Sequence, residues 1–95
     1  MDKPYFIYIL RCADDTLYTG ITTDVERRFA EHSGKPVGAK YTASHTPVRI
    51  EAVWQAENRS SASKAEYYVK KLPRAKKEAL ISGAPLELEN LIRIR

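Results

Sequence analysis

Apolar residues repeat at every second position in some stretches of the chain and at every third or fourth in others. The stretch YFIYILRC (5–12) is rich in β-branched and aromatic residues, which is typical of a buried strand. Turn-forming residues, ADD (13–15), follow it, and TLYTGI (16–21) predicts a returning strand. Two strands joined by so tight a turn must be antiparallel. Gly20, near the end of the second strand, indicates a bend or the close approach of another group.

Helical spacing follows this hairpin directly. The stretch TTDVERRFAEHSG (22–34) predicts a helix with Thr23 or Asp24 as its N-cap and Gly34 at its C-terminal end. The next segment, KPVGAKYTASHTP (35–47), contains turn-forming residues and little periodicity. We therefore expect a loop, and one long enough in a chain of this size to be a candidate for function.

Alternation returns in VRIEAVWQAE (48–57), which predicts a third strand. If the period of two holds along the whole stretch, one face of this strand carries the apolar side chains of Val48, Ile50, Ala52 and Trp54.

Two further helices are predicted in the second half of the chain. The first is NRSSASKAEYYVKKL (58–72), with Ser60 or Ser61 as its cap. The second is PRAKKEALIS (73–82), whose proline suits a first helical turn and which ends at Gly83.

The predicted order of elements is β-β-α-β-α-α, with the tail PLELENLIRIR (85–95) left unassigned. This order indicates an α+β fold in which helices flank a small three-stranded antiparallel sheet. A chain of 95 residues buries one modest core, so we expect a single domain over residues 1–95.

Composition narrows the class of protein. The only cysteine is Cys12, which excludes an intramolecular disulfide and a cysteine-rich metal site. No apolar run approaches the roughly 20 residues of a membrane span, and no secretory leader pattern is present, so we expect a cytoplasmic protein. The net charge of +4 favours an anionic partner. Between Lys64 and Lys77, six basic residues accompany a single acid, Glu66.

The first predicted helix places charged residues beside its apolar stripe. Val25 and Phe29 must face the core, which puts Arg28 and His32 on or beside the same stripe. Arg28 either covers apolar surface, pairs with a carboxylate, or binds a phosphate through its planar guanidinium. His32 either packs as an ordinary helix residue or takes part in catalysis.

The second predicted helix has one charged residue on its apolar stripe. That residue is Glu66, among Ala62, Ala65, Val69 and Leu72. A carboxylate in this position needs a cation. The cation is either a basic side chain, Arg28 or Lys70, or a divalent metal, because one carboxylate with water and substrate oxygens is a common way to hold Mg²⁺.

Tyr8 and Tyr18 both lie in the predicted hairpin, where tyrosines are ordinary strand residues. A phenol has a pKa near 10, so forming a phenolate at pH 7 costs about 4 kcal/mol. A nearby arginine or metal ion lowers that cost. The hairpin alone therefore favours packing, and a catalytic role requires such neighbours.

Together these residues resemble the GIY-YIG nuclease family. The stretches that carry the motif are FIY (6–8), YTG (18–20) and TDVERRFAEH (23–32). Glu66, on a helix after a third strand, resembles the metal-binding glutamate of the family. The stretches GAKYT (38–42) and SSASKAEYYVKKL (60–72) are similar to small stand-alone bacterial members, and also to the nuclease domain of the eukaryotic enzyme that cuts branched DNA. The resemblance covers residues 5 to about 80.

The resemblance implies an endonuclease that hydrolyses DNA phosphodiester bonds. The catalytic residues that it implies are Tyr8, Tyr18, Arg28, His32 and Glu66. Glu66 would hold Mg²⁺ or Mn²⁺, Arg28 would stabilise charge on the phosphate, and a tyrosine would take or position a proton of the attacking water. The expected partner is DNA, branched or otherwise structured, in repair or recombination. Basic side chains would contact its phosphates, namely Lys40, Lys64, Lys70, Lys71, Lys76 and Lys77.

Departures from the motif keep a second class of function open. Phe6 stands in place of the first glycine, and Thr19 in place of the isoleucine of the second half. The stretch KKEALISG (76–83) has no asparagine, which many members carry after the glutamate. The alternative is a non-catalytic nucleic-acid-binding or protein-interaction module on the same fold. A protein partner that supplies specificity is a further candidate partner.

Overall fold

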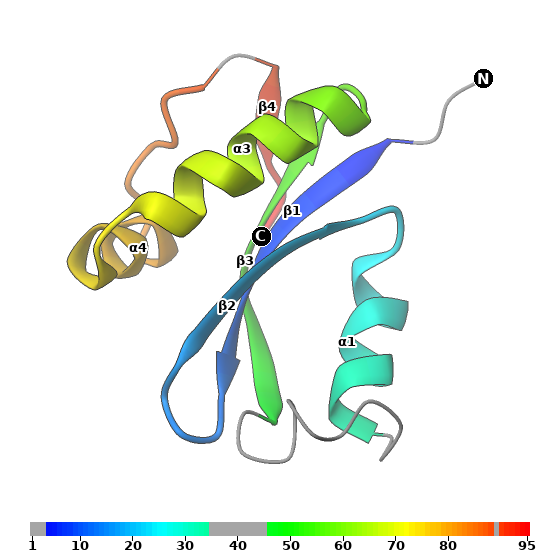
Figure 1. Ribbon diagram of the computed structural model, residues 1–95, viewed down its shortest axis with the longest axis vertical. Coiled ribbons are helices and arrows are strands. Elements are labelled where there is room, and N and C mark those ends of the chain that lie inside the picture. Colours follow the sequence, from blue (N-terminus) through cyan, green and yellow to red (C-terminus); the bar gives the residue numbers. More distant parts are fainter. Residues whose placement is uncertain (1–3, 35–45, 89) are drawn as a thin grey trace.

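The computed structural model describes residues 4–34, 46–88 and 90–95. Within them, four strands form one antiparallel sheet in the order β2-β1-β3-β4, accompanied by three helices (Figure 1). The elements are β1 (Tyr5–Cys12), β2 (Leu17–Thr22), α1 (Val25–Gly34), β3 (Pro47–Ala56), α3 (Arg59–Lys71), α4 (Arg74–Ile81) and β4 (Leu91–Arg93). The predicted α+β class is confirmed, and a fourth strand enlarges the predicted three-stranded sheet.

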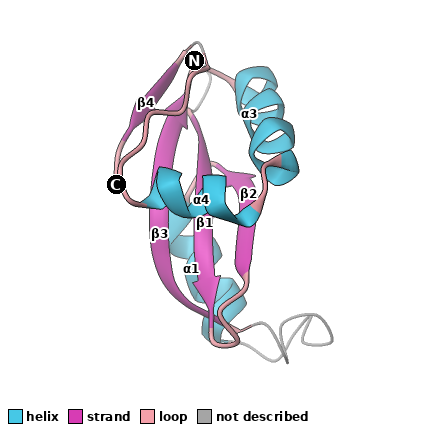
Figure 2. Cartoon of the chain, turned by 90° about the vertical axis from the view of Figure 1, so that its left-hand side faces the viewer, coloured by secondary structure: helices cyan, strands magenta, loops and turns pink. Residues whose placement is uncertain are grey.

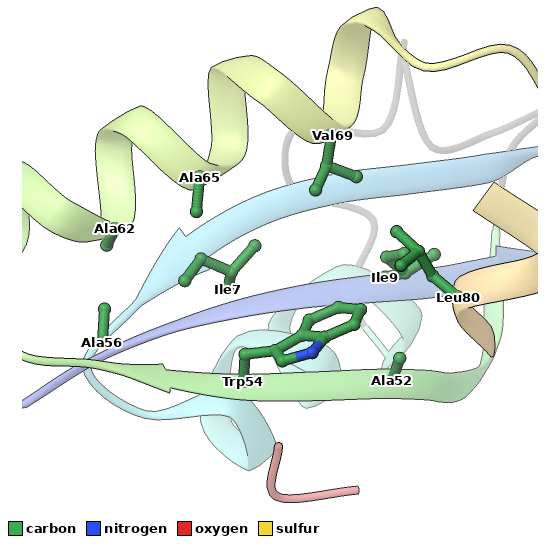
Figure 3. Close-up of a cluster of buried hydrophobic side chains, with 9 residues drawn as sticks. All are labelled: Ile7, Ile9, Ala52, Trp54, Ala56, Ala62, Ala65, Val69 and Leu80. Atoms are coloured by element: carbon green, nitrogen blue, oxygen red, sulfur yellow. The ribbon is translucent and has the colours of Figure 1, made fainter. Parts of the chain in front are cut away.

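Helices cover both faces of the sheet, so the core has two layers. Figure 2 shows α3 and α4 in front of the sheet and α1 behind it. On the α3–α4 face, Ile7 and Trp54 are buried against Ala65, Val69 and further side chains of the same cluster (Figure 3). On the α1 face, a smaller cluster is buried beneath partly buried helix side chains; its members are Tyr8, Leu10 and Val53. Because alternate residues of β1 face opposite ways, Ile7 and Tyr8 belong to different layers.

A bulge in β3 changes which of its side chains share a face. Ile9 pairs with Ala52, but the next residue, Leu10, pairs with Ile50, so Glu51 is an extra residue in the strand. Ile50 therefore joins the α1 face, whereas Ala52 and Trp54 lie on the other. The third strand is thus confirmed, but the period of two fails at Glu51, so Val48, Ile50, Ala52 and Trp54 do not share a face; Val48 is exposed.

An aspartate caps α1 and an asparagine caps α3, at positions that differ partly from the prediction. Asp24 accepts a hydrogen bond from the Arg27 N–H at 3.0 Å, as expected of an N-cap of α1. The N-cap of α3 is Asn58, whose side-chain oxygen accepts from the Ser61 N–H at 2.9 Å. The prediction of Ser60 or Ser61 as this cap is wrong because the asparagine, two or three residues earlier, already satisfies the free N–H group.

The fourth strand was hidden in the weakly alternating tail. β4 pairs with only three residues of β3, and its Ile92 is exposed. So short a strand with an exposed apolar residue does not show a clear alternation of apolar and polar positions. Arg93 fixes the strand instead. Its guanidinium lies 4.9 Å from the centre of the Trp54 ring and donates to the Leu80 carbonyl at 2.8 Å. The tail is thereby attached to both β3 and the C-terminal end of α4.

A network of ion pairs joins the far end of β1 to α4. The Arg11 side chain is 14% exposed and contacts Glu51 at 2.5 Å, Asp15 at 2.7 Å and Glu78 at 2.8 Å. Arg74 also pairs with Glu78, at 2.9 Å. These contacts fix α4 over the sheet. None of the helices in the described ranges has both the length and the apolar character needed to cross a membrane.

Candidate catalytic site

Tyr8 occupies the centre of the candidate site and depends on a glycine beside it. It lies on β1 directly opposite Gly20 of β2, and 1% of it is exposed. A methyl group at position 20 would lie 2.5 Å from Oη and 2.8 Å from Cζ of Tyr8. Gly20 is therefore needed for space, because the Tyr8 ring crosses the backbone of β2 at the point where a side chain would otherwise stand.

Tyr18 lies beside Tyr8 on the same face of the hairpin. It pairs with Leu10, whose side chain also faces α1. The two tyrosine rings are tilted by 39°, with their centres 6.2 Å apart. Gly20 separates them along β2, since a methyl group there would also lie 3.3 Å from Cε2 of Tyr18. Both phenols thus reach one region near the β2 edge of the sheet.

Arg28 approaches the tyrosines from α1. Val25 and Phe29 pack on the Tyr8 cluster and so turn this side of α1 toward the sheet. Arg28 is exposed overall, yet its guanidinium faces the Tyr8 oxygen, which is the main cause of the raised pKa of Arg28. The contact falls short of a regular hydrogen bond: the Tyr8 hydroxyl is buried and has no hydrogen-bond partner among the described residues.

The pKa of Tyr8 reflects this environment. Burial raises the pKa of the phenol above its ordinary value of 10.0, and the neighbouring Tyr18 raises it further. Arg28 acts in the opposite direction but does not outweigh burial. The Tyr8 phenol of the free protein therefore keeps its proton at neutral pH.

Glu66 approaches the site from α3, on the other face of the sheet from α1. α3 packs against β2 and β1, and the Glu66 side chain, next to buried Ala65, is 25% exposed. Its carboxylate lies 3.3 Å from the Lys70 ammonium, one helical turn away. It is also near enough to Tyr8 to contribute to the raised pKa of that phenol. Of the partners weighed from the sequence, Lys70 is the one that forms an ion pair with Glu66 here.

The number of metal-binding side chains near Glu66 decides which kind of metal site is feasible. No group of three or more His, Cys, Asp or Glu side chains comes together within residues 4–34, 46–88 and 90–95. A closed, all-protein metal cage is thus absent from this part of the chain. One carboxylate beside an unpartnered phenol fits a hard cation held mainly through water and substrate oxygens, as Mg²⁺ commonly is.

The remaining predicted site residues are placed to different extents. His32 belongs to the last turn of α1, but its side chain lies outside the described residues, as does Lys40. The loop predicted over 35–47 also falls mostly outside them. Of the other predicted phosphate-contacting residues, Lys64, Lys70, Lys71 and Lys76 are exposed and Lys77 is half-buried.

Two features of the site were not recognised in the sequence. The partner of Gly20 could have been found, because a turn centred on residue 14 pairs Tyr8 with Gly20 by position alone. The second feature is Thr19, whose buried hydroxyl has no hydrogen-bond partner among the described residues. It pairs with Ile9 and so faces the α3–α4 side. In the sequence Thr19 stands where the family motif has isoleucine, but this difference does not indicate a buried hydroxyl without a partner.

The chain matches a known family over most of its length. Residues 4–79 match the family model described as the GIY-YIG catalytic domain. A UPF0213 protein of Natronomonas pharaonis is 48% identical over 82 residues, which are 86% of this chain and 95% of the relative. A UPF0213 protein of Desulfotalea psychrophila is 45% identical over 84 residues, 87% of this chain and 76% of the relative.

A solved structure shows the same fold. The solution NMR structure of a UPF0213 protein from Bacillus halodurans is 44% identical, has a TM-score of 0.55 and matches over 92% of each chain. The resemblance indicated by the tyrosine, arginine and glutamate positions is therefore confirmed. The chain belongs to the GIY-YIG family and, within it, to the UPF0213 proteins.

Proposed function

We propose that this chain is a metal-dependent endonuclease that hydrolyses DNA phosphodiester bonds. The observation that carries the proposal is the buried Tyr8 hydroxyl, which faces Arg28 and lacks a hydrogen-bond partner among the described residues. Leaving a buried polar group unpaired costs about 1–3 kcal/mol. Such a cost is understandable where a substrate or an attacking water supplies the missing partner.

Arg28 is the proposed phosphate-binding residue. Its planar guanidinium matches the geometry of phosphate oxygens and keeps its charge at every pH at which the protein is folded. Fixed beside Tyr8, it would stabilise the negative charge that develops on the phosphate as the bond to the leaving oxygen breaks.

Glu66 is the proposed metal ligand. Magnesium or manganese, when bound, would supply positive charge to a phosphate oxygen and to the leaving 3′ oxygen. Because Glu66 is paired with Lys70 in the free protein, the Lys70 ammonium would have to move away as the carboxylate takes up this role. Lys70 is exposed and flexible at its end, so the exchange requires no change in α3.

The two tyrosines would handle the attacking water. A bond forms between the water oxygen and phosphorus while the bond from phosphorus to the 3′ oxygen breaks. One of Tyr8 and Tyr18 would take a proton of the water or position it, and the other would orient it. A tyrosine that takes the proton must first lose its own, and the positive charges of Arg28 and of a bound metal ion would favour that phenolate. His32, one turn beyond Arg28 on α1, is proposed to assist this proton transfer.

One observation favours the alternative of a non-catalytic nucleic-acid-binding module. The carboxylate of Glu66 already has a cation in Lys70, so the ion pair alone explains why an acid is retained on this helix. Such a module would bind DNA through the exposed lysines and cleave nothing.

Cleavage assays separate the two functions. Labelled single strands, duplexes, flaps, three-way and four-way DNA junctions and an RNA would be incubated with Mg²⁺, with Mn²⁺ or with a chelator. Glu66→Gln is the test variant, and Glu57→Gln, at an exposed glutamate just after β3, is its matched control. We expect metal-dependent cleavage that Glu66→Gln loses and Glu57→Gln retains. Binding without cleavage of any substrate by the folded protein would support the alternative.

A further inference from the structure

The outward face of α3 carries an aromatic residue that the proposed chemistry does not use. Tyr67 is 63% exposed, the largest exposed fraction among the aromatic side chains of the described residues. The Lys71 ammonium, four residues on, lies 4.3 Å from the centre of its ring. This contact covers one face of the ring and leaves the rest of it open to solvent.

The neighbouring tyrosine, Tyr68, is also exposed, to 44%, but its surroundings differ from those of Tyr67. Tyr68 lines a hollow of about 340 Å³ together with Leu72, Leu80 and Leu86. Tyr68 therefore faces the side of α3 on which α4 and the segment after it lie. Tyr67 does not line that hollow, and it points away from the buried Ala65 and Val69.

Basic residues connect Tyr67 to the candidate catalytic site. At about 100° per residue, Lys70 lies between Glu66 and Tyr67 around the helix axis, and Lys71 and Lys64 lie beyond Tyr67. α3 has Glu66 as its only acid. A nucleic-acid strand with a phosphate at Glu66 and Arg28 could thus pass Lys70 and reach Tyr67 and Lys71 on the same side of the helix.

We propose that Tyr67, with Lys71 on one face of its ring, is a stacking platform for an unpaired base of the bound strand. The inference rests on the proposed function for the nature of the partner, and it adds the substrate class: nucleic acid with a single-stranded segment next to the cleaved phosphate. A base inside a duplex presents only its edge, whereas an unpaired base presents the flat surface that an exposed tyrosine ring binds.

The test measures binding in the presence of chelator, so that cleavage does not interfere. The probes are a labelled single strand carrying 2-aminopurine, the same strand in a duplex, and a flap with that strand unpaired. Three variants are compared with the wild type at one salt concentration, because binding is salt-dependent. Tyr67→Ala removes the ring, Tyr67→Phe keeps it, and Ile92→Ala removes an equally exposed apolar side chain on β4 as the matched control.

We expect Tyr67→Ala to weaken binding of the single strand and the flap by about 5- to 100-fold, the loss typical of one stacked base. Tyr67→Phe and Ile92→Ala should stay within about twofold of the wild type, and duplex binding should change little. The quenching of 2-aminopurine that stacking produces should disappear in Tyr67→Ala alone. Tyr67 is exposed on a helix, so alanine suits its backbone, and circular dichroism would verify that the variants are folded.

The outcomes also separate this inference from the proposed function. Unchanged single-strand binding by Tyr67→Ala, or no binding of single strands by the wild type, would overturn the platform even if the protein cleaves DNA. Selective loss of single-strand binding in Tyr67→Ala, with no cleavage under any metal condition, would support the platform and count against the nuclease.

Discussion

Replacing Gly20 with alanine tests whether the candidate site is built around the Tyr8 ring. The added methyl group would lie 2.5 Å from the Tyr8 oxygen and 2.8 Å from Cζ, whereas carbon atoms in contact prefer about 3.5–4.0 Å. Tyr8 is 1% exposed, so its ring cannot swing into solvent without disrupting the α1 face of the core. Overpacking of this kind costs about 1–3 kcal/mol.

We therefore expect Gly20→Ala to lower the free energy of unfolding by about 1–3 kcal/mol, and Tm by about 4–8 °C for each kcal/mol. Chemical denaturation followed by Trp54 fluorescence measures the loss. In a Tyr8→Phe background the closest contact is absent, so the same substitution should cost at least about 0.5 kcal/mol less.

Gly83→Ala, measured in the same two backgrounds, is the matched control for this double-mutant cycle. Gly83 has a φ of 115°, and an added methyl group there would meet nothing within 4 Å. Its substitution strains the backbone without touching Tyr8, so the cost should be the same in both backgrounds. An equal cost of Gly20→Ala with and without the Tyr8 hydroxyl, or a cost near zero, would refute the reasoning that Gly20 makes room for the phenol.

Three further predictions follow from other contacts. Thr19→Val should raise the free energy of unfolding by about 1 kcal/mol in denaturant titrations, because the buried hydroxyl that it removes is unpaired; a loss of stability would show that the hydroxyl is bonded. Arg11 lowers the pKa of Glu78 from 4.5 to about 2, so this pair should stabilise the fold above pH 4.5 and lose that contribution as pH falls toward 2. Glu78→Gln should flatten this part of the pH–stability curve, and an unchanged curve would contradict the pairing. Lys70→Ala combined with Lys71→Ala should weaken DNA binding and reduce the slope of log affinity against log salt by at most about two units, and an unchanged slope would place the phosphate contacts elsewhere.

The strands and helices that bury one clear face were predictable from the sequence. The hairpin of β1 and β2 and the stripe of α3 have strong periodicity and marked turns, so the structure matches them closely. β4 was not predictable, because Arg93 attaches it through contacts with Trp54 and the end of α4 rather than through a buried apolar pattern. The face assignment in β3 failed at Glu51, since a bulge reverses the alternation without changing the composition.

The candidate site was predictable in part for a similar reason. Tyr8 and Arg28 stand at motif spacings on elements that the pattern identifies, so their proximity follows once the elements pack. The burial and missing hydrogen bond of the Tyr8 hydroxyl depend on the register of the hairpin and on the packing of α1, which periodicity does not encode. In the Arg11 network, likewise, Arg11 and Glu78 are 67 positions apart, too distant for any local pattern to connect.

Single-turnover cleavage of one labelled branched DNA with Mg²⁺ tests the central claim most directly. Arg28→Ala would be compared with Arg27→Ala, at a neighbouring arginine whose guanidinium lies 3.9 Å from Glu31 on the same helix. We predict that Arg28→Ala slows cleavage by about 10²–10³-fold, as loss of a charge-stabilising group typically does, while Arg27→Ala stays close to the wild type. Equal rates for the two variants would contradict a phosphate-stabilising role for Arg28 and the site built around it.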